Sequence, residues 1–572
     1  MKYTRLFGKT MKDAPKDATL ISHRLLYQAG FIRESTAGRY YFLPLGMRVH
    51  DKVKKIIKEE MDNAGAQEMV TPVLHPKELW KETNRTTSVG FELMSIKDRN
   101  DFEFVLGGTA EEMLVDVVRK FQISYKDLPF NLYQFSTKFR DEMRARGGLL
   151  RLREFVMKDA YSFHESEEDF KVEYEHMKKT YKRIFDRLGL PTVIVESDNG
   201  YIGGEYCHEF VVESEAGESK FYMTEDGSYA AHEEVTKFVR DDKNLDEEEK
   251  PMEKVDAVRG TTMEDGVKLH GLPLWQQMKD FLAVDEKGRY ILAVIRGDFD
   301  VNEIKLAHVV KAYTLRHATP EEFKKIGSEP GFISPVGLKE KAKKNGMEVL
   351  IVGDTSLRTV KNMYTGDNAL HKDLLNVNID KDYSLDIEAD IALVREGDIA
   401  ENGMPLIAKR GIEVGNVFQL GFHYSSKMKG ATYTAEDGSQ KPYYMGCYGI
   451  GLARTMATIV EKFHDDRGIV WPKNVSPFLV HLISLQKGEK TEELYAKLRE
   501  KGIDVLYDDR DASAGQKFAD ADIIGLPVRL VVSEKTLSSG SGDMVEWKER
   551  VDTHNELVTF DEAMERLLKS ME

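Results

Sequence analysis

Residues 139–155 read "FRDEMRARGGLLRLREF" and carry five arginines on the two sides of the pair Gly147-Gly148. Two adjacent glycines between polar, alternating runs are typical of a turn between two strands. Strand side chains alternate between faces, so such a hairpin gathers charged and aromatic groups on one surface. The residues placed there are Arg140, Glu142, Arg151, Arg153 and Phe155. Guanidinium groups pair with phosphate oxygens and an aromatic ring stacks on a base, so the segment predicts a nucleotide-binding hairpin, with a salt-bridged surface hairpin as the alternative.

A second segment, "MGCYGIGLARTMATIVEKFH" at 445–464, places two glycines and an arginine before a helix. The helix is predicted by the helical spacing of Leu452, Met456, Ile459, Val460 and Phe463. Gly449-x-Gly451-x-x-Arg454 lacks the third glycine of a dinucleotide fingerprint. The free N–H groups of a helix N-terminus favour anions, and Arg454 adds a positive charge. This segment therefore favours a polyphosphate.

The composition limits the class of protein. The chain has 572 residues, a length typical of roughly three or four domains. Its two cysteines cannot form a disulfide framework and fit a reducing cytoplasm. We find no signal peptide and no run that could span a membrane. The net charge of −16 argues against non-specific DNA binding, although a local basic patch can still bind nucleic acid.

The order of apolar patterns predicts an α/β chain of several domains. Residues 47–64 form a helix with Val53, Ile56, Ile57 and Met61 on one face, and the following "AQEMVTPVL" is an edge strand because Pro72 cannot donate to a sheet. This pair is either a dimer seam or an ordinary part of the core. Residues 239–256 are a charged linker or a solvated loop, followed by an α/β insert. After "IVWPKNVSP" a β-α-β-α-β alternation predicts a small α/β domain.

Several motifs together resemble the class II aminoacyl-tRNA synthetases. "FRDE…RLREF" is similar to their second signature motif, "GIGLAR" to the third, and the helix leading to Pro72 to the first. Within the class, "GGTAEE", "FQLGFHYS", "MGCYGIG" and "FADADIIGLPVRL" are similar to the bacterial prolyl-tRNA synthetases, along essentially the whole chain. Class I signatures are absent, since there is no His-x-Gly-His and "SSKMKG" is only superficially like the lysine loop.

The resemblance implies a domain plan and a homodimer joined by the first motif. An antiparallel β-sheet catalytic domain flanked by helices is expected in 1–223 and 408–472. An α/β editing domain is expected in 224–407, and an α/β anticodon-binding domain in 473–572.

The resemblance also implies ATP, Mg²⁺, L-proline and tRNA(Pro) as ligands, with proline activated as prolyl-adenylate. The ionised carboxylate of proline needs no general base, so the site must offset charge in the transition state. The implied ATP-binding residues are Arg140, Glu142, Arg151, Phe155, Gln419, Gly449, Gly451 and Arg454, of which Arg140, Glu142 and Arg454 are catalytic. The implied proline-binding residues are Thr109, Glu111, Arg140, His423 and Cys447. From the residues alone, Thr109 would be a helix N-cap.

Mg²⁺ is expected to arrive with ATP. A protein metal site at Cys207 and His208 is rejected, because adjacent strand residues point apart.

A pocket for proline cannot exclude alanine, since each missing methylene is worth only ~1–3 kcal/mol. A second, hydrolytic site is therefore expected in the insert, and the resemblance implies Lys279, Gly331, Pro335 and His371 for it. Taken alone, Lys279 would be a solvated lysine on an amphipathic helix. For tRNA the implied contacts are Arg144 and Arg146 at the acceptor end and Arg510, Lys517 and Asp520 at the anticodon.

Two alternatives remain beside a proline enzyme. One is a class II-like binding protein without catalysis, which the retained phosphate arginines disfavour. The other is a synthetase for threonine, glycine or histidine, which Thr109 and Glu111, the large insert and the lack of Cys/His metal ligands disfavour.

Overall fold

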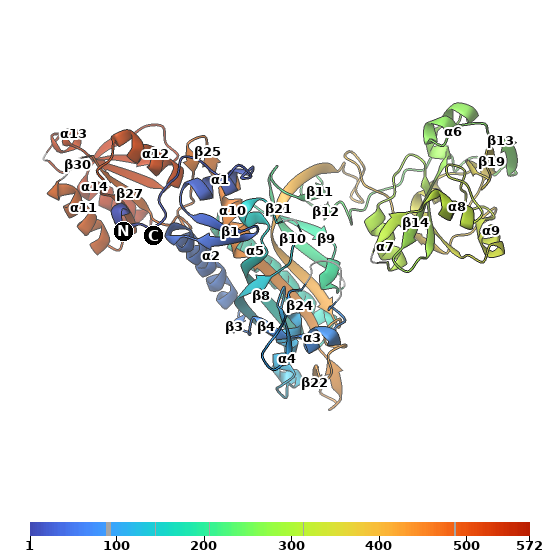
Figure 1. The fold of residues 1–572 in the computed structure, drawn as a ribbon, viewed down its shortest axis with the longest axis horizontal. Coiled ribbons are helices and arrows are strands. Elements are labelled where there is room, and N and C mark those ends of the chain that lie inside the picture. Colours follow the sequence, from blue (N-terminus) through green and yellow to red (C-terminus); the bar gives the residue numbers. More distant parts are fainter. Residues whose placement is uncertain are drawn as a thin grey trace. The chain divides into compact units, whose positions relative to one another are not determined.

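The computed structural model describes residues 1–86, 93–143, 145–204, 206–312, 314–485, 488–540 and 542–571. The chain forms two compact units. Unit 1 comprises Met1–Val195, Asn199–Ser219 and Arg410–Glu572, and unit 2 comprises Glu196–Asp198 and Lys220–Lys409 (Figure 1). Within the described ranges, no helix is both long and apolar enough to cross a lipid bilayer.

Unit 1 is built on a mostly antiparallel sheet in which distant segments are neighbours. Strand β24 pairs with β21 on one side and β8 on the other, β10 pairs with β21, and β7 pairs with β8. The short β3 closes one edge, parallel to β7. The bounds are β3 Gln67–Glu68, β7 Phe130–Phe139, β8 Glu154–His164, β10 Tyr206–Glu213, β21 Ile407–Gly421 and β24 Tyr444–Gly451. The orange β24 beside the teal β8 shows this mixing of early and late sequence (Figure 1).

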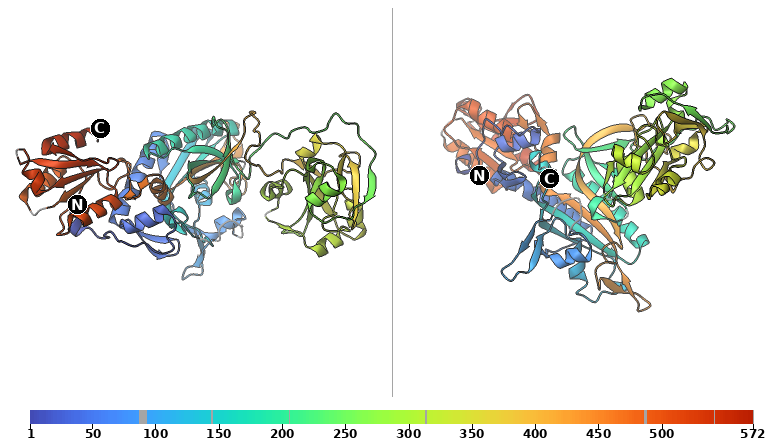
Figure 2. Two further views of the ribbon diagram at one scale, coloured as in Figure 1. Left: turned by 90° about the horizontal axis from the view of Figure 1, so that it is seen from above. Right: turned by 45° about the vertical axis from the view of Figure 1, so that its right-hand side comes forward.

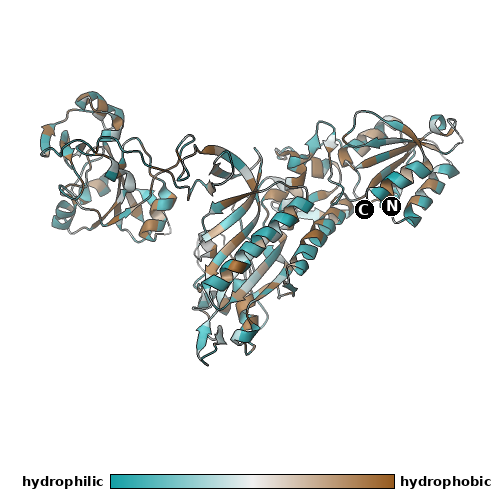
Figure 3. Ribbon diagram, turned by 180° about the vertical axis from the view of Figure 1, so that it is seen from behind, coloured by the Kyte–Doolittle hydropathy of each residue, from teal (hydrophilic) through white to brown (hydrophobic). Residues whose placement is uncertain are grey.

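Helices with one apolar face cover this sheet in layers. α5 (Glu167–Arg187) and α10 (Leu452–Lys462) pack on its strands, α2 (Pro44–Asn63) packs on both of these helices, and α1 (Ile21–Gln28) packs on α10. The left view of Figure 2 shows α5, in teal, lying along the sheet. In Figure 3 hydrophilic and hydrophobic residues alternate along the long helices, as expected for helices that bury a single face.

The helix predicted at 47–64 is confirmed, and the four apolar residues named for its inner face are all buried. It ends before Gly65, whose φ of +82° favours glycine. The strand predicted after it is much shorter than expected: β3 has two residues, and Pro72 separates it from β4 (Leu74–Pro76). Its position at the sheet edge is confirmed.

The predicted arginine hairpin has the expected antiparallel pairing, but its strands are shorter than expected. β7 ends at Phe139 and β8 begins at Glu154, so most of the arginines lie in the connection rather than on strand faces. That connection contains the 3-10 helix η3 (Gly148–Leu150). Gly147 and Gly148 both have positive φ, and a side chain on Gly148 would lie 2.8 Å from His23. The two glycines thus form a compact loop instead of a two-residue turn.

The C-terminal part of unit 1 is a five-stranded sheet in the order β28-β27-β29-β30-β31. The predicted alternation is confirmed by β27 (Val480–Ser484), α11 (Glu489–Glu500), β28 (Val505–Asp508), α12 (Ala514–Ile524) and β29 (Val528–Val532). Three further elements were not predicted from the sequence: β30 (Met544–Glu549), β31 (Glu556–Thr559) and α14 (Phe560–Lys569).

Unit 2 has its own core between two sheets, in the orders β16-β14-β15-β17-β20 and β13-β19-β18. Their bounds are β13 Glu253–Asp256, β14 Met278–Asp285, β15 Tyr290–Arg296, β16 Leu315–His317, β17 Val349–Asp354, β18 Met363–Gly366, β19 Lys372–Val377 and β20 Ile387–Ala389. The linker predicted at 239–256 lies within unit 2, where the Val239 N–H donates to Ile399 and the Lys243 N–H to Thr359. The linker interpretation is therefore wrong.

The chain leaves unit 1 after Ser219 and returns at Arg410. These two points lie side by side, because the Ser214 N–H donates to the Arg410 carbonyl at 3.1 Å. A side chain on Gly217 would lie 2.0 Å from the Gly411 carbonyl oxygen, so only glycine permits this approach.

Candidate active site

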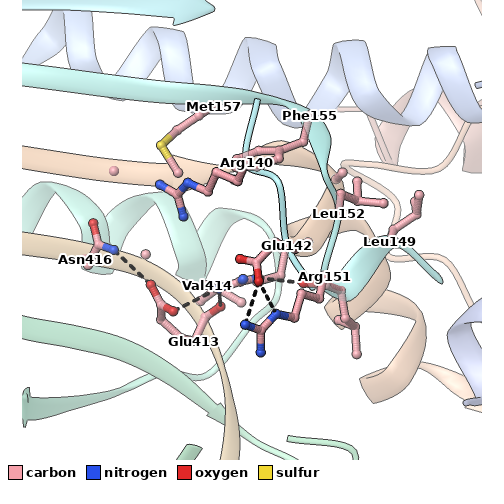
Figure 4. Close-up of a pocket in the computed structure, with 16 residues that line it drawn as sticks. Arg140, Glu142, Leu149, Arg151, Leu152, Phe155, Met157, Glu413, Val414 and Asn416 are labelled. Atoms are coloured by element: carbon pink, nitrogen blue, oxygen red, sulfur yellow. Dashed lines mark hydrogen bonds and ion pairs between the residues drawn. The ribbon is translucent and has the colours of Figure 1, made fainter. Parts of the chain in front are cut away.

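One pocket of unit 1 collects residues from the β7–β8 connection, β21 and the β24–α10 junction (Figure 4). Its volume is about 80 Å³, and it adjoins a wider cavity of about 620 Å³. Seven of the eight predicted ATP-binding residues line it: Arg140, Glu142, Arg151, Phe155, Gly449, Gly451 and Arg454. Groups separated by some 300 positions in the sequence thus face a common space.

Arg140 is one of the residues that line the pocket. Its Nε donates to the carbonyl oxygen of Gly108 at 3.2 Å, and its guanidinium lies 5.4 Å from the centre of the Phe155 ring. Figure 4 shows the two side chains side by side. The bond to Gly108 connects the pocket to the residues that immediately precede Thr109.

The two other arginines pair with carboxylates. Arg151 donates to Glu142 at 2.7 Å and to Glu218 at 3.2 Å, and Arg454 donates to Glu413 at 2.9 Å. Burial opposes the charged form of Arg151, but pairing with Glu142 raises its pKa above the ordinary value. Both guanidinium groups are held at the pocket by carboxylates, and their planar forks suit an anion.

The glycines at 449 and 451 leave room beside Arg454. β24 ends at Gly451 and α10 begins at Leu452, so Arg454 is in the first turn of the helix. A side chain on Gly449 would lie 2.8 Å from the Asn416 amide oxygen. The predicted junction of strand and helix is confirmed, with no intervening loop.

A second cluster, the Glu111 cluster, lies next to this pocket and consists of Arg85, Thr109, Glu111, Glu112 and Cys447. The Thr109 hydroxyl lies 2.7 Å from each carboxylate oxygen of Glu111, and the Cys447 thiol lies 3.5 Å from Oε1. Both glutamates are fully buried. The N-cap expected at Thr109 is wrong: α4 (Glu111–Val118) is capped by Ala110, and the Thr109 side chain is committed to Glu111.

Arg85 supplies the positive charge of this cluster. Its Nη1 contacts Glu112 at 2.9 Å and Glu111 at 3.2 Å. Its guanidinium also lies over the rings of Trp80 and Tyr424. Arg85 was not predicted from the sequence. A usable signal was the adjacent pair Glu111-Glu112 on an otherwise apolar helix, because two buried carboxylates require a cation.

Two further residues predicted for this region are His423 and Gln419. Burial lowers the pKa of His423 to about 4, with Lys427, Arg85 and Glu111 also acting on it, so the imidazole is neutral. Gln419 is buried on β21 and its amide donates to the Tyr444 hydroxyl. Gln419 is the one predicted ATP-binding residue that does not line the pocket.

The residues predicted to contact tRNA are only partly described. Arg144 lies outside the described residues, and Arg146 pairs with Glu218 at 2.5 Å. In the C-terminal sheet Arg510 pairs with Asp520 at 2.8 Å. Lys517 is buried, and its ammonium donates to the Ser484 carbonyl at 2.6 Å.

In unit 2 the predicted residues fall into two places. The Gly331–Pro335 loop approaches His371, whose ring packs edge-on against Phe332 at 5.7 Å. Lys279 lies on strand β14, so the expected amphipathic helix is wrong. Its ammonium donates to the Phe299 carbonyl and to Asp300 at 2.6 and 2.7 Å.

A buried ion pair, also missed, supports the loop. Arg259 donates to Asp373 and to the Gly331 carbonyl. Among the described residues, no three His, Cys, Asp or Glu side chains are grouped to hold a metal ion.

Comparisons with known proteins agree with this architecture. The tRNA synthetase class II core domain (G, H, P, S and T) matches residues 91–463, and the anticodon binding domain matches residues 479–570. The proline–tRNA ligase of Sulfurihydrogenibium sp. (strain YO3AOP1) is 44% identical over 575 residues, covering 99% of each chain. That of Thermotoga maritima is 41% identical over 579 residues, covering 100% of this chain and 98% of its own.

Two solved structures share the fold at low identity. The prolyl-tRNA synthetase of Giardia lamblia in complex with prolyl-adenylate has a TM-score of 0.56 at 15% identity, covering 94% of this chain and 74% of that one. The Cryptosporidium parvum enzyme with L-proline and AMP has a TM-score of 0.57 at 12% identity, covering 98% and 76%.

Proposed function

The chain belongs to the proline–tRNA ligases, with a class II core and an anticodon-binding domain, and from this membership we propose that it activates L-proline with ATP and transfers it to tRNA(Pro). The products of the two steps are pyrophosphate, AMP and prolyl-tRNA(Pro). The observation that carries the proposal is the single pocket lined by Arg140, Arg151 and Arg454, with the Glu111 cluster beside it.

In the first step a proline carboxylate oxygen attacks the α-phosphorus, and pyrophosphate leaves. Arg140 would contact both the carboxylate and the α-phosphate; its bond to the Gly108 carbonyl, next to Thr109, supports this role. Arg151 and Arg454 offset the charge of the leaving phosphates, and Phe155 and Glu142 position adenine. Glu111 and Thr109 receive the ammonium of proline, while His423 and Cys447 line that pocket.

Mg²⁺ neutralises part of the triphosphate charge when bound. Glu413 is a carboxylate of the pocket, and its hard oxygen donors suit this ion. Because Glu413 already pairs with Arg454, the triphosphate would release it as it takes the guanidinium group.

Pyrophosphate exchange measured with each of the twenty amino acids tests this assignment. Proline is expected to support exchange at least about 100-fold better than threonine, glycine or histidine. Exchange with another of these amino acids would point to a sister synthetase. No exchange with any amino acid would favour a non-catalytic relative.

We further propose that unit 2 hydrolyses alanyl-tRNA(Pro), and that domain bounds of 1–223 with 408–472, 224–407 and 473–572 describe catalysis, editing and anticodon binding. Support comes from the compactness of unit 2, with its own core, and from the proximity of the Gly331–Pro335 loop to His371.

The protein would act in the cytoplasm as a homodimer, with the β3 edge as its seam, where Val70 is 74% exposed.

Lys279→Ala is expected to lower the deacylation of alanyl-tRNA(Pro) about 10-fold, because the variant loses the ammonium group that anchors Phe299 and Asp300. The measurement is decay of labelled alanyl-tRNA(Pro), with prolyl-tRNA formation followed in parallel and expected to be unchanged. Lys287→Ala, on the exposed turn between β14 and β15, is the matched control. Equal deacylation by both variants would show that Lys279 is ordinary surface charge.

A further inference from the structure

A chain of buried hydrogen bonds crosses the sheet of unit 1 beneath the Glu111 cluster. It begins at Thr71, three residues beyond the edge strand β3, whose N–H and hydroxyl both donate to the side-chain oxygen of Gln134 at 2.9 Å. The amide nitrogen of Gln134 then donates to Oδ2 of Asp159 at 3.0 Å. Gln134 and Asp159 lie on the adjacent strands β7 and β8 and pair directly in register.

Asp159 is the hub of this chain. Its Oδ2 also accepts from the Lys138 ammonium at 2.8 Å and from the Tyr161 hydroxyl at 3.0 Å. Asp159 and its three donors are at most 1% exposed, so water does not compete for these bonds. A buried carboxylate that is paired with a cation and bonded by neutral donors is a rigid anchor.

Tyr161 connects the chain to the turn that precedes α4. Because the Asp159 carboxylate accepts only, the Tyr161 hydroxyl hydrogen points toward it and the oxygen lone pairs remain for other donors. That oxygen accepts the Ala110 N–H at 3.0 Å and lies 3.4 Å from the Thr109 hydroxyl. The Tyr161 hydroxyl therefore holds Ala110, the N-cap residue of α4, and with it the adjacent Thr109–Glu111 pair.

We propose that Tyr161 and Asp159 are positioning residues for proline binding, and that the chain from Thr71 holds Glu111 in the geometry that receives the substrate ammonium. This inference rests on the proposed function, because it takes Glu111 as the ammonium site. A buried polar network that only stabilised the fold would affect the use of ATP and proline alike. A positioning role predicts an effect confined to proline.

Tyr161→Phe tests the proposal by removing a single oxygen. In pyrophosphate exchange the KM for proline is expected to rise about 10-fold, and the KM for ATP to stay within about twofold. The matched control is Tyr448→Phe on the neighbouring strand β24: Tyr448 is equally buried, and its hydroxyl bonds Ser162 at 2.9 Å without reaching α4. Tyr448→Phe is expected to leave both KM values unchanged at a similar Tm. Equal kinetics for the two variants, or a parallel rise in both KM values, would overturn the proposal.

Thr71→Val probes the far end of the chain, because Thr71 lies outside both the residues that line the pocket and the Glu111 cluster. It removes the hydroxyl but keeps the N–H bond to Gln134, so a smaller rise of about threefold in the KM for proline is expected, with recovery in Thr71→Ser. If Tyr161→Phe does not fold, Thr71→Val and Thr71→Ser test the proposal on their own. An unchanged KM for proline in Thr71→Val would then contradict the proposal. Glu111→Gln distinguishes failure of the positioning role from failure of the proposed function, because normal pyrophosphate exchange in that variant would contradict the proposed ammonium site itself. Inactive Glu111→Gln beside normal Tyr161→Phe and Thr71→Val would defeat only the positioning role.

Discussion

Arg140→Ala is expected to reduce proline-dependent pyrophosphate exchange by about 1,000-fold or more, while the thermal unfolding curve stays close to that of the unchanged protein. Arg140 lines the pocket and also reaches the segment preceding Thr109, and it is the group that we propose offsets charge where carboxylate and α-phosphate meet. Removing one preorganised charge at a transition state typically costs a factor of ~100–1,000, and the loss of substrate alignment adds to it.

Arg140→Lys refines this result. It keeps the charge but loses the planar fork, so exchange should fall by about 10- to 100-fold, between the two extremes. Arg39→Ala is a suitable control, because Arg39 lies outside the pocket and its carboxylate contact, Glu154, is 3.7 Å away. Exchange that survives Arg140→Ala would remove the basis for placing the α-phosphate here.

Arg85→Met is expected to lower the free energy of unfolding by about 3–5 kcal/mol and to abolish proline activation. The side chain is 5% exposed and contacts two glutamates that are fully buried. Removing one partner of a buried ion pair leaves its counter-charge in an environment that cannot solvate it. Chemical denaturation followed by fluorescence measures the loss. Arg119→Met is the control, since its partly exposed pairs with Glu82 and Asp116 are worth at most about 1 kcal/mol.

The stability deficit of Arg85→Met should shrink as the pH falls. Burial raises the pKa of Glu112, and Arg85 is the main group holding it down, so the variant carboxyl binds a proton at higher pH. A carboxyl whose folded pKa exceeds its unfolded value stabilises the fold when protonated and loses that contribution as pH rises through the folded pKa. Denaturation at pH 5.5 and 8 should therefore show a smaller deficit at pH 5.5. A deficit independent of pH would mean that Arg85 acts only through packing.

The spacing of apolar residues predicted the helices and strands that bury one face, but it could not predict the conformation of the loops. The helix at 47–64, the helix after Gly451 and the C-terminal alternation follow from apolar spacing alone. The arginine segment alternates like a strand, yet the left-handed conformations of Gly147 and Gly148 turn it into a loop. Lys279 was expected on a helix because a short apolar run does not distinguish helix from strand.

The candidate site depended on pairings that no local pattern contains. Arg140 and Arg454 line the same pocket because β24 pairs with β8, with Gly451 opposite Met157. The spacing of residues within either motif does not indicate this register. The resemblance to a family supplied those partners in advance. It did not supply Arg85, Asp159 or Tyr161, which touch groups from three separate segments and are recognisable only as the missing partners of buried charge.

The close approach of Gly217 to Gly411 brings the two ends of the insert together, so most of the insert can be exchanged as one segment. Because the chain departs and returns close together on the host sheet, a donor segment from another relative needs to match two closely spaced junctions, provided that β11 (Ser219–Met223) and β12 (Ala230–His232), which pair within that sheet, are kept. Chimaeras joined after His232 and before Arg410 would then exchange the rest of unit 2 and leave the pocket residues of unit 1 in place, and directed evolution could mutate the insert and its host in separate libraries.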